Sequence, residues 1–413
     1  MASMFAHVPS ILLKNATITS RGSTTSSSDL RIDEGSISAM AVGGSLTPQA
    51  DEEVVDLDGY LLLPTAVEPH AHLDKAFLAE HVENPTGDLL GAIEAMSNHR
   101  HLFDREDTIE RAERAAQLMA ANGYSAIRTH ADTTTEQGLL SIEALTEVRR
   151  RMAEVIDIEI VALCGSPIVG PDGADQRALL KEALSSGADL VGGCPHLEDQ
   201  GDLAAATEIY LEAATDHGVG VDLHTDETLD SDVLGLVDLA HQVLSGFEYR
   251  VTASHCVSLG MQSHRRQQEI AELVAEAAIG VVALPHTNLF LQGRGQYPMP
   301  RGLTAVAALQ SAGVTVAAGA DNLQDPFNPV GRGCPFETAG LMVIAAHLLP
   351  TDAWSSVSAA PRQVLGLPPG AIEVGAVSNM FAVRADSVRE AIAFGPADRI
   401  VWRKGTRLQE TQS

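Results

Sequence analysis

The sequence predicts an α/β protein: a (β/α)₈ TIM-type barrel with a small β-sandwich domain built from both chain termini. The first observation is a series of apolar, β-type runs through the middle of the chain, each ending in polar residues. The second is the helical periodicity between these runs, which recur at intervals of about 30 residues, the length of one strand–helix unit. Apolar strands that alternate with helices indicate a parallel sheet, and eight such units favour a closed barrel over an open sheet. The eight runs are residues 61–72, 124–132, 158–166, 189–196, 218–227, 250–256, 280–288 and 314–322.

Both ends of the chain show a different pattern. Residues 8–65 contain short alternating runs such as "SILLKNATI" and "EEVVDLDGYLLLP", separated by glycines and aspartates. The same pattern returns near the C-terminus, in "AIEVGAVSNMFAVRA" and "DRIVWRKGTRL". Short strands with turn residues between them are typical of a small β-sandwich. We therefore expect residues 1–65 and 371–413 to form one composite domain beside a barrel of residues 66–370.

The composition disfavours several classes of function. The 413 residues carry a formal net charge of −28 with a pI near 4.8, and such a surface repels nucleic acids and anionic membranes. No stretch approaches the ~18 uninterrupted apolar residues of a membrane-spanning helix, and the first residues do not resemble a secretory signal. The four cysteines are scattered without a CxxC pair, which favours a reducing compartment. We expect a cytoplasmic protein that binds a small molecule and neither nucleic acid nor membrane.

Polar residues gather where the predicted barrel strands end. The active site of such a barrel lies at the carboxyl ends of its strands. A lone histidine there is more often a structural hydrogen-bonding group than a ligand, but most of the eight runs end in such groups. Folding would bring imidazoles and carboxylates to one mouth, which predicts a metal site with acid–base groups beside it. These residues are His70, His72, His130, Asp132, His196, His224, Glu227, His255, His286, Asn288, Asp321 and Asn322.

The stretch "EPHAHLDKAF", at the end of the first run, has a spacing that suits chelation. His70 and His72 are two positions apart on a strand, so both side chains point to the same side. Together with a histidine ending the fifth run and an aspartate ending the eighth, this HxH pair resembles the amidohydrolase superfamily. The resemblance implies that His70, His72, His224 and Asp321 hold the metal ion of the barrel.

Further motifs resemble the branch of that superfamily that contains cytosine deaminase and N-isopropylammelide isopropylaminohydrolase. They are "VEPHAHLDKAF", "IRTHAD", "DLHTDE", "RVTASHC", "NLFLQGRG" and "GADNLQDPFNPVGRG". The resemblance implies that Glu227 shuttles protons, that His255 orients the attacking hydroxide and the developing oxyanion, and that Asp321 acts in catalysis as well as metal binding. Strand four, "DLVGGCPHLED", lacks the lysine that many binuclear relatives carboxylate, which implies one divalent ion. Zn²⁺ and Fe²⁺ both suit a site of nitrogen and oxygen ligands.

The substrate contacts are harder to transfer, because the chain departs from cytosine deaminase. The glutamine with which that enzyme recognises its pyrimidine is missing from residues 164–170, and Asn322 stands where it has a second aspartate. We expect Lys75 to contact a substrate oxo group, with a salt bridge to Asp74 or Glu68 as the alternative. The expected substrate contacts are Lys75, Ser166, Asn288, Phe290, Gln292 and Asn322, of which Phe290 fits the protein core equally well.

These features predict hydrolytic deamination at a C–N bond of a small nitrogen heterocycle, such as a cytosine-like pyrimidine or a hydroxylated triazine. A metal-activated hydroxide would attack the ring and Glu227 would move the protons. The alternative is a hydantoinase-like hydrolase of cyclic amides or ureides, which the missing lysine of strand four disfavours. A barrel that only binds its ligand needs neither Glu227 nor His255, and phosphoester hydrolysis is disfavoured because the strand ends lack basic clusters. The particular heterocycle, the native metal and association into a homo-oligomer stay open at this point.

Overall fold

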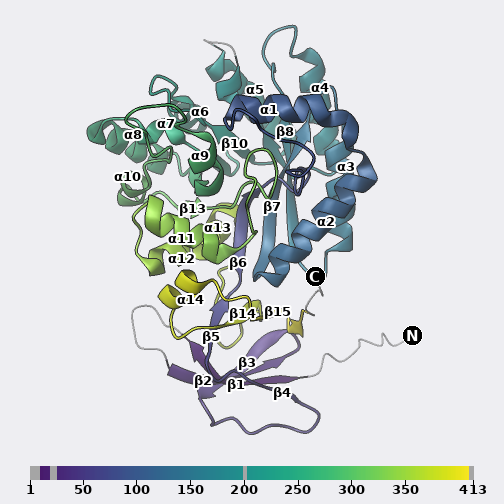
Figure 1. Ribbon diagram of the computed structural model, residues 1–413, viewed down its shortest axis with the longest axis vertical. Helices are drawn as coiled ribbons and strands as arrows, with labels where there is room; N and C mark the ends of the chain where they lie inside the picture. Colours follow the sequence, from purple (N-terminus) through teal and green to yellow (C-terminus); the bar gives the residue numbers. More distant parts are fainter. Residues whose placement is uncertain (1–9, 19–25, 199–201, 409–413) are drawn as a thin grey trace.

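The computed structural model describes residues 10–18, 26–198 and 202–408, and Figure 1 shows their arrangement. A parallel barrel surrounded by helices forms the larger part of the molecule, and a smaller sheet lies at one end of it. Strands from both ends of the chain form the smaller sheet, so the predicted architecture is confirmed. Residues 1–9, 19–25 and 409–413 of the predicted terminal domain lie outside the described residues, and the domain boundaries stay a prediction.

The barrel consists of eight parallel strands in chain order. Each strand pairs with the next one along the chain, from β6 to β13. Most of their residues are buried, as expected for strands that are covered on both faces. The strands are β6 (Ala66–Ala71), β7 (Tyr124–Thr133), β8 (Asp157–Cys164), β9 (Leu190–Gly192), β10 (Val221–Thr225), β11 (Val251–His255), β12 (Gly280–Ala283) and β13 (Val316–Ala318).

The barrel closes next to the predicted metal ligands, between the residues that follow β13 and the end of β6. Ala71 forms a parallel bridge with Asp321. Asp321 N donates a hydrogen bond to His70 O at 3.0 Å, and His72 N donates one to Asp321 O at 3.2 Å. The backbone bonds that close the barrel therefore fix three of the four predicted ligands relative to one another.

The helices around the barrel begin and end at residues suited to these positions. Asp88 caps α1 by accepting a hydrogen bond from Gly91 N, and Asp104 caps α2 by accepting one from Asp107 N. Helix α5 ends at Gly218, whose positive φ of 69° suits a glycine. None of the helices in the described residues combines the length and hydrophobicity that spanning a bilayer requires. The helices are α1 (Leu89–His99), α2 (Arg105–Ala121), α3 (Leu140–Arg151), α4 (Ala174–Ser185), α5 (Leu203–His217), α6 (Gly235–Leu244), α7 (Val257–Gly260), α8 (His264–Glu276), α9 (Pro285–Leu291), α10 (Val306–Ser311), α11 (Pro335–Ala345), α12 (Pro350–Val357), α13 (Ala359–Leu365) and α14 (Val388–Phe394), with short 3₁₀ turns at η1 (Arg100–Leu102) and η2 (Pro195–Leu197).

Three of the predicted strand runs differ from the observed strands. The fourth run, residues 189–196, ends as a strand at Gly192, and η2 begins at Pro195. The first run, residues 61–72, is split, because β5 (Tyr60–Pro64) joins the small sheet and only β6 enters the barrel. The seventh run, residues 280–288, leaves the sheet early, and α9 begins at Pro285. Proline suits the first turn of a helix, where its missing N–H costs no hydrogen bond. Asn288 consequently lies on a helix and not at a strand end.

The small sheet also has eight strands, in the order β16-β15-β14-β5-β1-β2-β3, and β4 pairs with β1. Strand β14 is antiparallel to β5, with Phe381 opposite Leu63, so C-terminal strands complete a sheet that N-terminal strands begin. Because β5 leads directly into β6, this sheet lies at the amino end of the barrel (Figure 1). The carboxyl ends of the barrel strands are left free for a site. The remaining strands are β1 (Ile11–Ile18), β2 (Ser26–Asp33), β3 (Ser36–Val42), β4 (Glu53–Asp56), β14 (Met380–Arg384), β15 (Arg399–Arg403) and β16 (Thr406–Arg407).

Trp402 is the largest side chain in the core of the small sheet. It is fully buried, in a cluster with Leu13, Leu62 and Met380. Replacing Trp402 by alanine should lower the free energy of unfolding by about 3–5 kcal/mol, because the cavity that remains has little to fill it. Denaturant unfolding measures this loss, and Tyr297→Ala, at a side chain that is 91% exposed, is the control expected to stay near wild type. A Trp402→Ala protein as stable as that control would contradict this packing.

Candidate functional site

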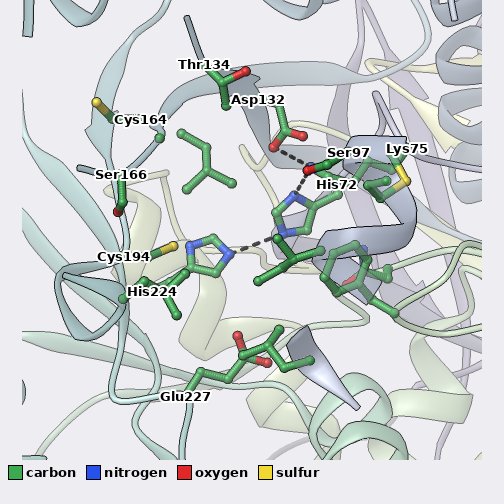
Figure 2. A pocket seen from close by; sticks show the side chains of 18 of the residues that line it. His72, Lys75, Ser97, Asp132, Thr134, Cys164, Ser166, Cys194, His224 and Glu227 are labelled. Carbon is green, nitrogen blue, oxygen red and sulfur yellow. Dashed lines mark hydrogen bonds and ion pairs between the residues drawn. The ribbon is translucent and has the colours of Figure 1, made fainter. Parts of the chain in front are cut away.

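A pocket of about 360 Å³ opens at the carboxyl ends of the barrel strands (Figure 2). Helix α1 contributes an apolar wall to this pocket through Leu89, Ile93 and Met96. A small pocket with apolar walls and a few convergent polar groups suits a small ring compound. The predicted site residues that line the pocket are His72, Lys75, Asp132, Ser166, His196, His224, Glu227, His255, Asp321 and Asn322.

The four predicted metal ligands converge at the bottom of this pocket. Nε2 of His70 and Nε2 of His72 lie 3.6 and 3.3 Å from Asp321 Oδ1, and the Nε2 atoms of His72 and His224 are 3.3 Å apart. Among the described residues, neither His70 Nε2 nor either carboxylate oxygen of Asp321 has a hydrogen-bond partner. Buried polar atoms without partners are rare in folded proteins, and here their lone pairs face a common centre. The arrangement fits a divalent cation held by nitrogen and oxygen.

Burial keeps the three imidazoles in the form that binds a cation. Burial and the neighbouring histidines hold the pKa of His70 and of His224 well below the usual value. Burial and the Lys75 ammonium do the same for the pKa of His72. A neutral imidazole offers the lone pair that coordinates a metal ion. Burial raises the pKa of Asp321, against the opposing effect of His255, and a cation in the cluster would offset the cost of burying this carboxylate.

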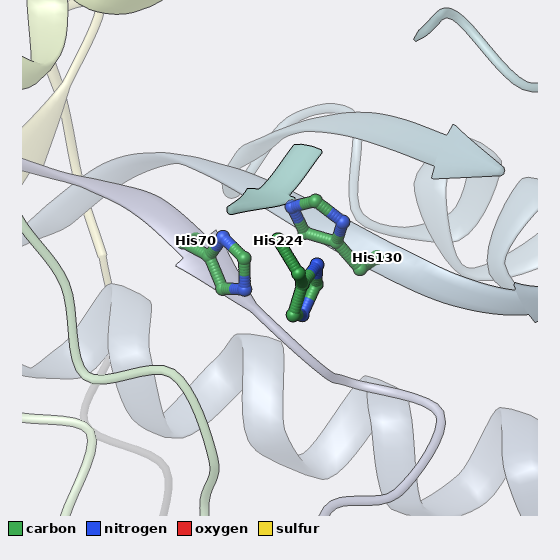
Figure 3. Close-up of side chains that lie close together, drawn as sticks. All are labelled: His70, His130 and His224. Atoms are coloured by element: carbon green, nitrogen blue, oxygen red, sulfur yellow. The ribbon is translucent and has the colours of Figure 1, made fainter. Parts of the chain in front are cut away.

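His130 on β7 belongs to the same cluster, although it was not among the metal ligands expected from the sequence. Its ring centroid lies 3.9 Å from that of His70, and Figure 3 shows the two rings together with His224. The ligand atoms of these three histidines lie within 4.8 Å of one another. Among the described residues neither ring nitrogen of His130 has a hydrogen-bond partner. The structure thus places a fourth imidazole directly beneath the predicted ligands.

Glu227 and His255 lie side by side and share a contact with Asn288. His255 Nδ1 lies 3.4 Å from Glu227 Oε1, and Asn288 Nδ2 lies 3.3 Å from that oxygen and 3.0 Å from Nδ1. When Glu227 is ionised, as it must be to accept a proton, the opposite orientation of the Asn288 amide would place its oxygen against the carboxylate. An amide nitrogen can only donate, so His255 Nδ1 accepts and the ring hydrogen is on Nε2, which lies 4.0 Å from Asp321 Oδ2. The Nε2–H of His255 therefore points toward the metal-ligand cluster.

The Glu227 carboxyl group is placed for proton exchange. It is buried, and burial together with the Asp321 carboxylate raises its pKa well above the usual value. A raised pKa makes a carboxyl group hold a proton more readily than an ordinary carboxyl group does, which suits a general acid–base residue. Glu227 lies in the wall of the pocket, so a bound ring compound would meet it directly (Figure 2).

Three residues at the same strand ends have strained backbone conformations. Asp226, His255 and Asp321 have positive φ angles of 51°, 69° and 63°. Residues other than glycine rarely adopt this region, and they keep it only where the surrounding structure enforces it. The three residues follow or end β10, β11 and β13, so the strain coincides with the cluster of chemical groups.

Lys75 both lines the pocket and forms salt bridges, the two alternatives considered for it from the sequence. Its Nζ lies in the pocket wall, 2.7 Å from Asp132 Oδ1, 3.5 Å from Asp74 Oδ1 and 3.2 Å from His72 Nδ1. Burial lowers the pKa of Lys75, but the two carboxylates outweigh this effect and hold the pKa above the usual value. Lys75 is therefore a buried ammonium ion that faces the pocket from a salt-bridge network (Figure 2).

Two further predicted substrate contacts lie in the pocket wall. Ser166 follows β8 and is exposed, and Asn322 follows β13 and is buried. The Asn322 amide has both ends engaged: Nδ2 donates to Asp325 Oδ2 at 2.7 Å, and Oδ1 accepts from Thr287 Oγ1 at 3.2 Å. The orientation of Asn322 is therefore set by the protein before any ligand binds.

The other three predicted substrate contacts lie outside the pocket lining. Asn288 reaches Glu227 and His255 from behind, as described above. Gln292 Nε2 donates to the backbone oxygen of Glu227 at 3.2 Å. The Phe290 ring packs against the Arg294 guanidinium, whose carbon lies 4.7 Å from the ring centroid. Asn288 and Gln292 thus support the residue expected to move protons, and Phe290 packs away from the ligand.

Some pocket residues were not singled out from the sequence. Arg100, at the end of α1, donates to Thr134 Oγ1 at 2.6 Å and extends over the pocket. Gln176 on α4 lies beside residues 164–170, the segment that lacks the recognition glutamine of cytosine deaminase. Its Nε2 donates to Thr133 O at 2.5 Å, so the amide nitrogen is engaged by the protein. The unusual length of the segment between the first two barrel strands was an available signal for Arg100, since long connections in such barrels carry function.

A parallel barrel with imidazoles and carboxylates at its mouth defines a barrel hydrolase, and comparison with known families makes the class specific. The chain belongs to the amidohydrolase family, whose sequence profile matches residues 78–407. It is therefore an enzyme of a metal-dependent family that acts on carbon–nitrogen bonds other than peptide bonds.

Individual relatives agree with this assignment. The chain is 34% identical to a pterin deaminase of Rhizobium rhizogenes over 386 residues, which cover 91% of this chain and 86% of the relative. The 5-methylcytosine deaminase of Klebsiella pneumoniae liganded with 5-fluorocytosine is similar in structure, with a TM-score of 0.87 and 28% identity over 98% of both chains. The N-isopropylammelide isopropylaminohydrolase of Burkholderia multivorans has a TM-score of 0.82 and 27% identity over 97% of this chain and 98% of its own. The resemblance seen in the sequence motifs is confirmed.

Proposed function

We propose that this protein is a metal-dependent hydrolytic deaminase of a small oxo-substituted nitrogen heterocycle, and that a pterin is the first substrate to test. The observation that carries the proposal is the position of Glu227 and His255 beside a cluster of unpartnered imidazole and carboxylate atoms in one pocket. The relative with 34% identity is a pterin deaminase, which favours a bicyclic ring over a pyrimidine. The pocket volume of about 360 Å³ supports this choice, because it leaves room for a second ring.

One divalent ion, Zn²⁺ or Fe²⁺, would be held by His70, His72, His224 and Asp321. The fit rests on His70 Nε2 and the two Asp321 carboxylate oxygens, which have no hydrogen-bond partner in the described part of the chain, and on the Nε2 atoms of His72 and His224, which face each other at 3.3 Å. A bound divalent ion supplies Lewis acidity, which brings the pKa of water to roughly 7 and polarises the bond under attack. Strand β9, the fourth of the barrel, carries no lysine, which supports a single ion.

The residues around this cluster divide the proton transfers and the charge stabilisation. Glu227 takes one proton of the attacking water and delivers it to the ring nitrogen. It then passes the second proton, from the hydroxyl of the tetrahedral centre, to the leaving amine, which departs as ammonia and leaves an oxo group on the ring. His255 donates its Nε2 hydrogen to the oxygen that becomes negative as the tetrahedral centre forms. Asp321 accepts a hydrogen bond that orients the attacking oxygen. Lys75, Ser166 and Asn322 contact the polar edge of the ring, with Lys75 opposite an oxo group.

Asn288 holds the proton-transfer pair without touching the substrate. Replacing Asn288 by alanine should therefore lower kcat by about 10–100-fold and change KM little, because Glu227 and His255 lose the donor that sets their orientation. Steady-state kinetics of the deamination reaction measure the two constants. Asn15→Ala in the small sheet is the control expected to keep both constants. A large increase in KM at unchanged kcat would instead assign Asn288 to substrate binding.

An ammonia-release assay over a panel of heterocycles tests the proposed function. The panel contains pterin, cytosine, 5-methylcytosine, hydroxylated aminotriazines and hydantoin, with the metal content of the same preparation measured. The proposal predicts ammonia from at least one amino heterocycle and none from hydantoin. Ring opening of hydantoin without ammonia from any other member would favour the cyclic amide hydrolase and overturn the deaminase.

A further inference from the structure

We infer that Asp222 and Ser254 form a hydrogen-bond relay that fixes the tautomer of His70 and thereby prepares its Nε2 for the metal ion. The two residues are positioning residues, since they contact the imidazoles of His70 and His130 and contribute no predicted ligand atom of their own. The inference rests on the metal site proposed above, but the tautomer of His70 can be observed in the metal-free protein. It concerns residues inside β10 and β11, which the sequence analysis did not single out.

The direction of each hydrogen bond in the relay follows from chemistry. Ser254 Oγ lies 2.9 Å from His70 Nδ1 and 2.8 Å from Asp222 Oδ1, and all three residues are fully buried. An ionised carboxylate can only accept, so the one hydroxyl hydrogen of Ser254 goes to Asp222. Ser254 Oγ then accepts from His70, which places the ring hydrogen on Nδ1. The lone pair is left on Nε2, the atom that faces Asp321 at 3.6 Å.

Arg128 on β7 anchors the far end of the relay. One of its NH1 hydrogens goes to Asp222 Oδ2 at 2.9 Å and another to Thr252 Oγ1 at 3.0 Å. Its Nε donates to Glu159 Oε2 at 2.7 Å. The Arg128 guanidinium is buried between two carboxylates, so it compensates the buried charge of Asp222 and fixes which carboxylate oxygen faces Ser254.

In the part of the chain that the structure describes, neither of the other two predicted imidazole ligands has an acceptor that would hold a hydrogen on its Nδ1. His72 Nδ1 faces the Lys75 ammonium at 3.2 Å, and His224 Nδ1 has no partner among the described residues. His70 is also held from the side, because the His130 ring packs against it. His70 is therefore the ligand whose orientation is complete before an ion binds, and the others can adjust around it.

The isosteric change Asp222→Asn should reverse the relay. Arg128 can only donate, so the new amide must turn its oxygen toward Arg128 and its nitrogen toward Ser254. Ser254 would then accept from the amide and donate its hydroxyl hydrogen to His70 Nδ1. This selects the tautomer of His70 with the hydrogen on Nε2. A protonated Nε2 has no free lone pair and cannot bind a metal ion. Ser254→Ala removes the acceptor without this reversal and is the second variant.

Three proteins and one control carry the test: wild type, Asp222→Asn, Ser254→Ala and the control Ser356→Ala. Ser356 is equally buried, but its hydroxyl bonds Ala353 O in α12, away from the site. Nitrogen NMR of histidine-labelled, metal-free protein reads the tautomer of His70, assigned with a His70→Gln variant. Zn²⁺ affinity is measured by competition with a chelator, and circular dichroism checks that each variant is folded.

The relay predicts an Nδ1-protonated His70 in wild type and in Ser356→Ala, and Nε2 protonation in Asp222→Asn. It also predicts a Zn²⁺ affinity that is about 10–100-fold lower in both relay variants than in the control. An Nε2-protonated His70 in wild type, or control-like Zn²⁺ affinity in both relay variants, would overturn the relay. If wild type binds no Zn²⁺ at all, the metal site of the proposed function fails, and the NMR result still decides the relay.

Discussion

Replacing Glu227 by glutamine is expected to lower kcat by about 10²–10⁴-fold, the usual contribution of a general acid–base residue. The amide keeps the size of the side chain but can neither accept the proton of water nor return it to the ring. Glu227 is not among the predicted ligands, so the bound metal should stay at its wild-type level. Single-turnover and steady-state assays measure the rate, and elemental analysis measures the metal.

The matched control for this change is Glu272→Gln, at an exposed carboxyl group on α8. It alters net charge by the same amount and should leave both rate and metal content unchanged. A Glu227→Gln enzyme with wild-type kcat would remove Glu227 from the proton transfers. If it lost both activity and metal, the residue would belong to the metal site and not to the acid–base pair.

Replacing His224 by alanine is expected to empty the metal site and to lower kcat/KM by at least about 10²-fold, because Lewis acidity supplies several kcal/mol of transition-state stabilisation. His224 Nε2 lies 3.3 Å from His72 Nε2, so its loss opens one side of the cluster. Adding excess Zn²⁺ should restore little of the activity. Metal content after dialysis and deamination rate are measured on the same sample.

His241→Ala is the control for this variant, since His241 is exposed on α6 and far from the pocket lining. It should bind metal and turn over substrate as wild type does. The same comparison can be made by treating wild type with a chelator, which should abolish activity until Zn²⁺ or Fe²⁺ is returned. A metal-free enzyme that keeps full activity would contradict the assigned cluster.

The sequence predicted the barrel well because a strand buried on both faces is a continuous apolar run, and such runs are visible locally. It did not predict where the first run divides. Residues 60–64 and 66–71 follow each other in one predicted run, yet residues 60–64 pair with β14, more than three hundred positions further along the chain. Local patterns carry no information about such a partner. The start of α9 was another miss, although Pro285 was a visible signal for it.

The sequence also indicated which residues would meet at the mouth of the barrel, because the strand ends and the spacing of the histidines and carboxylates can be recognised in it. It could not assign partners inside the site. Asn288 was expected to touch the substrate, but the helical turn that begins at Pro285 carries it behind Glu227 and His255. Asp222 and Ser254 lie within apolar strand runs. A polar residue in such a run is expected to be buried and to need a hydrogen-bond partner, but the sequence does not say which residue that partner is.

The most direct test of the central claim is deamination in water enriched in the heavy oxygen isotope. Purified enzyme carrying its metal is incubated with the substrate identified by the ammonia screen, and the product is examined by mass spectrometry. A hydrolytic deaminase places one heavy oxygen at the carbon that carried the amine, releases one ammonia per product and leaves the ring intact. A ring-opened product that retains its amine nitrogen would contradict the proposed deamination, as would ammonia release without incorporation of the heavy isotope.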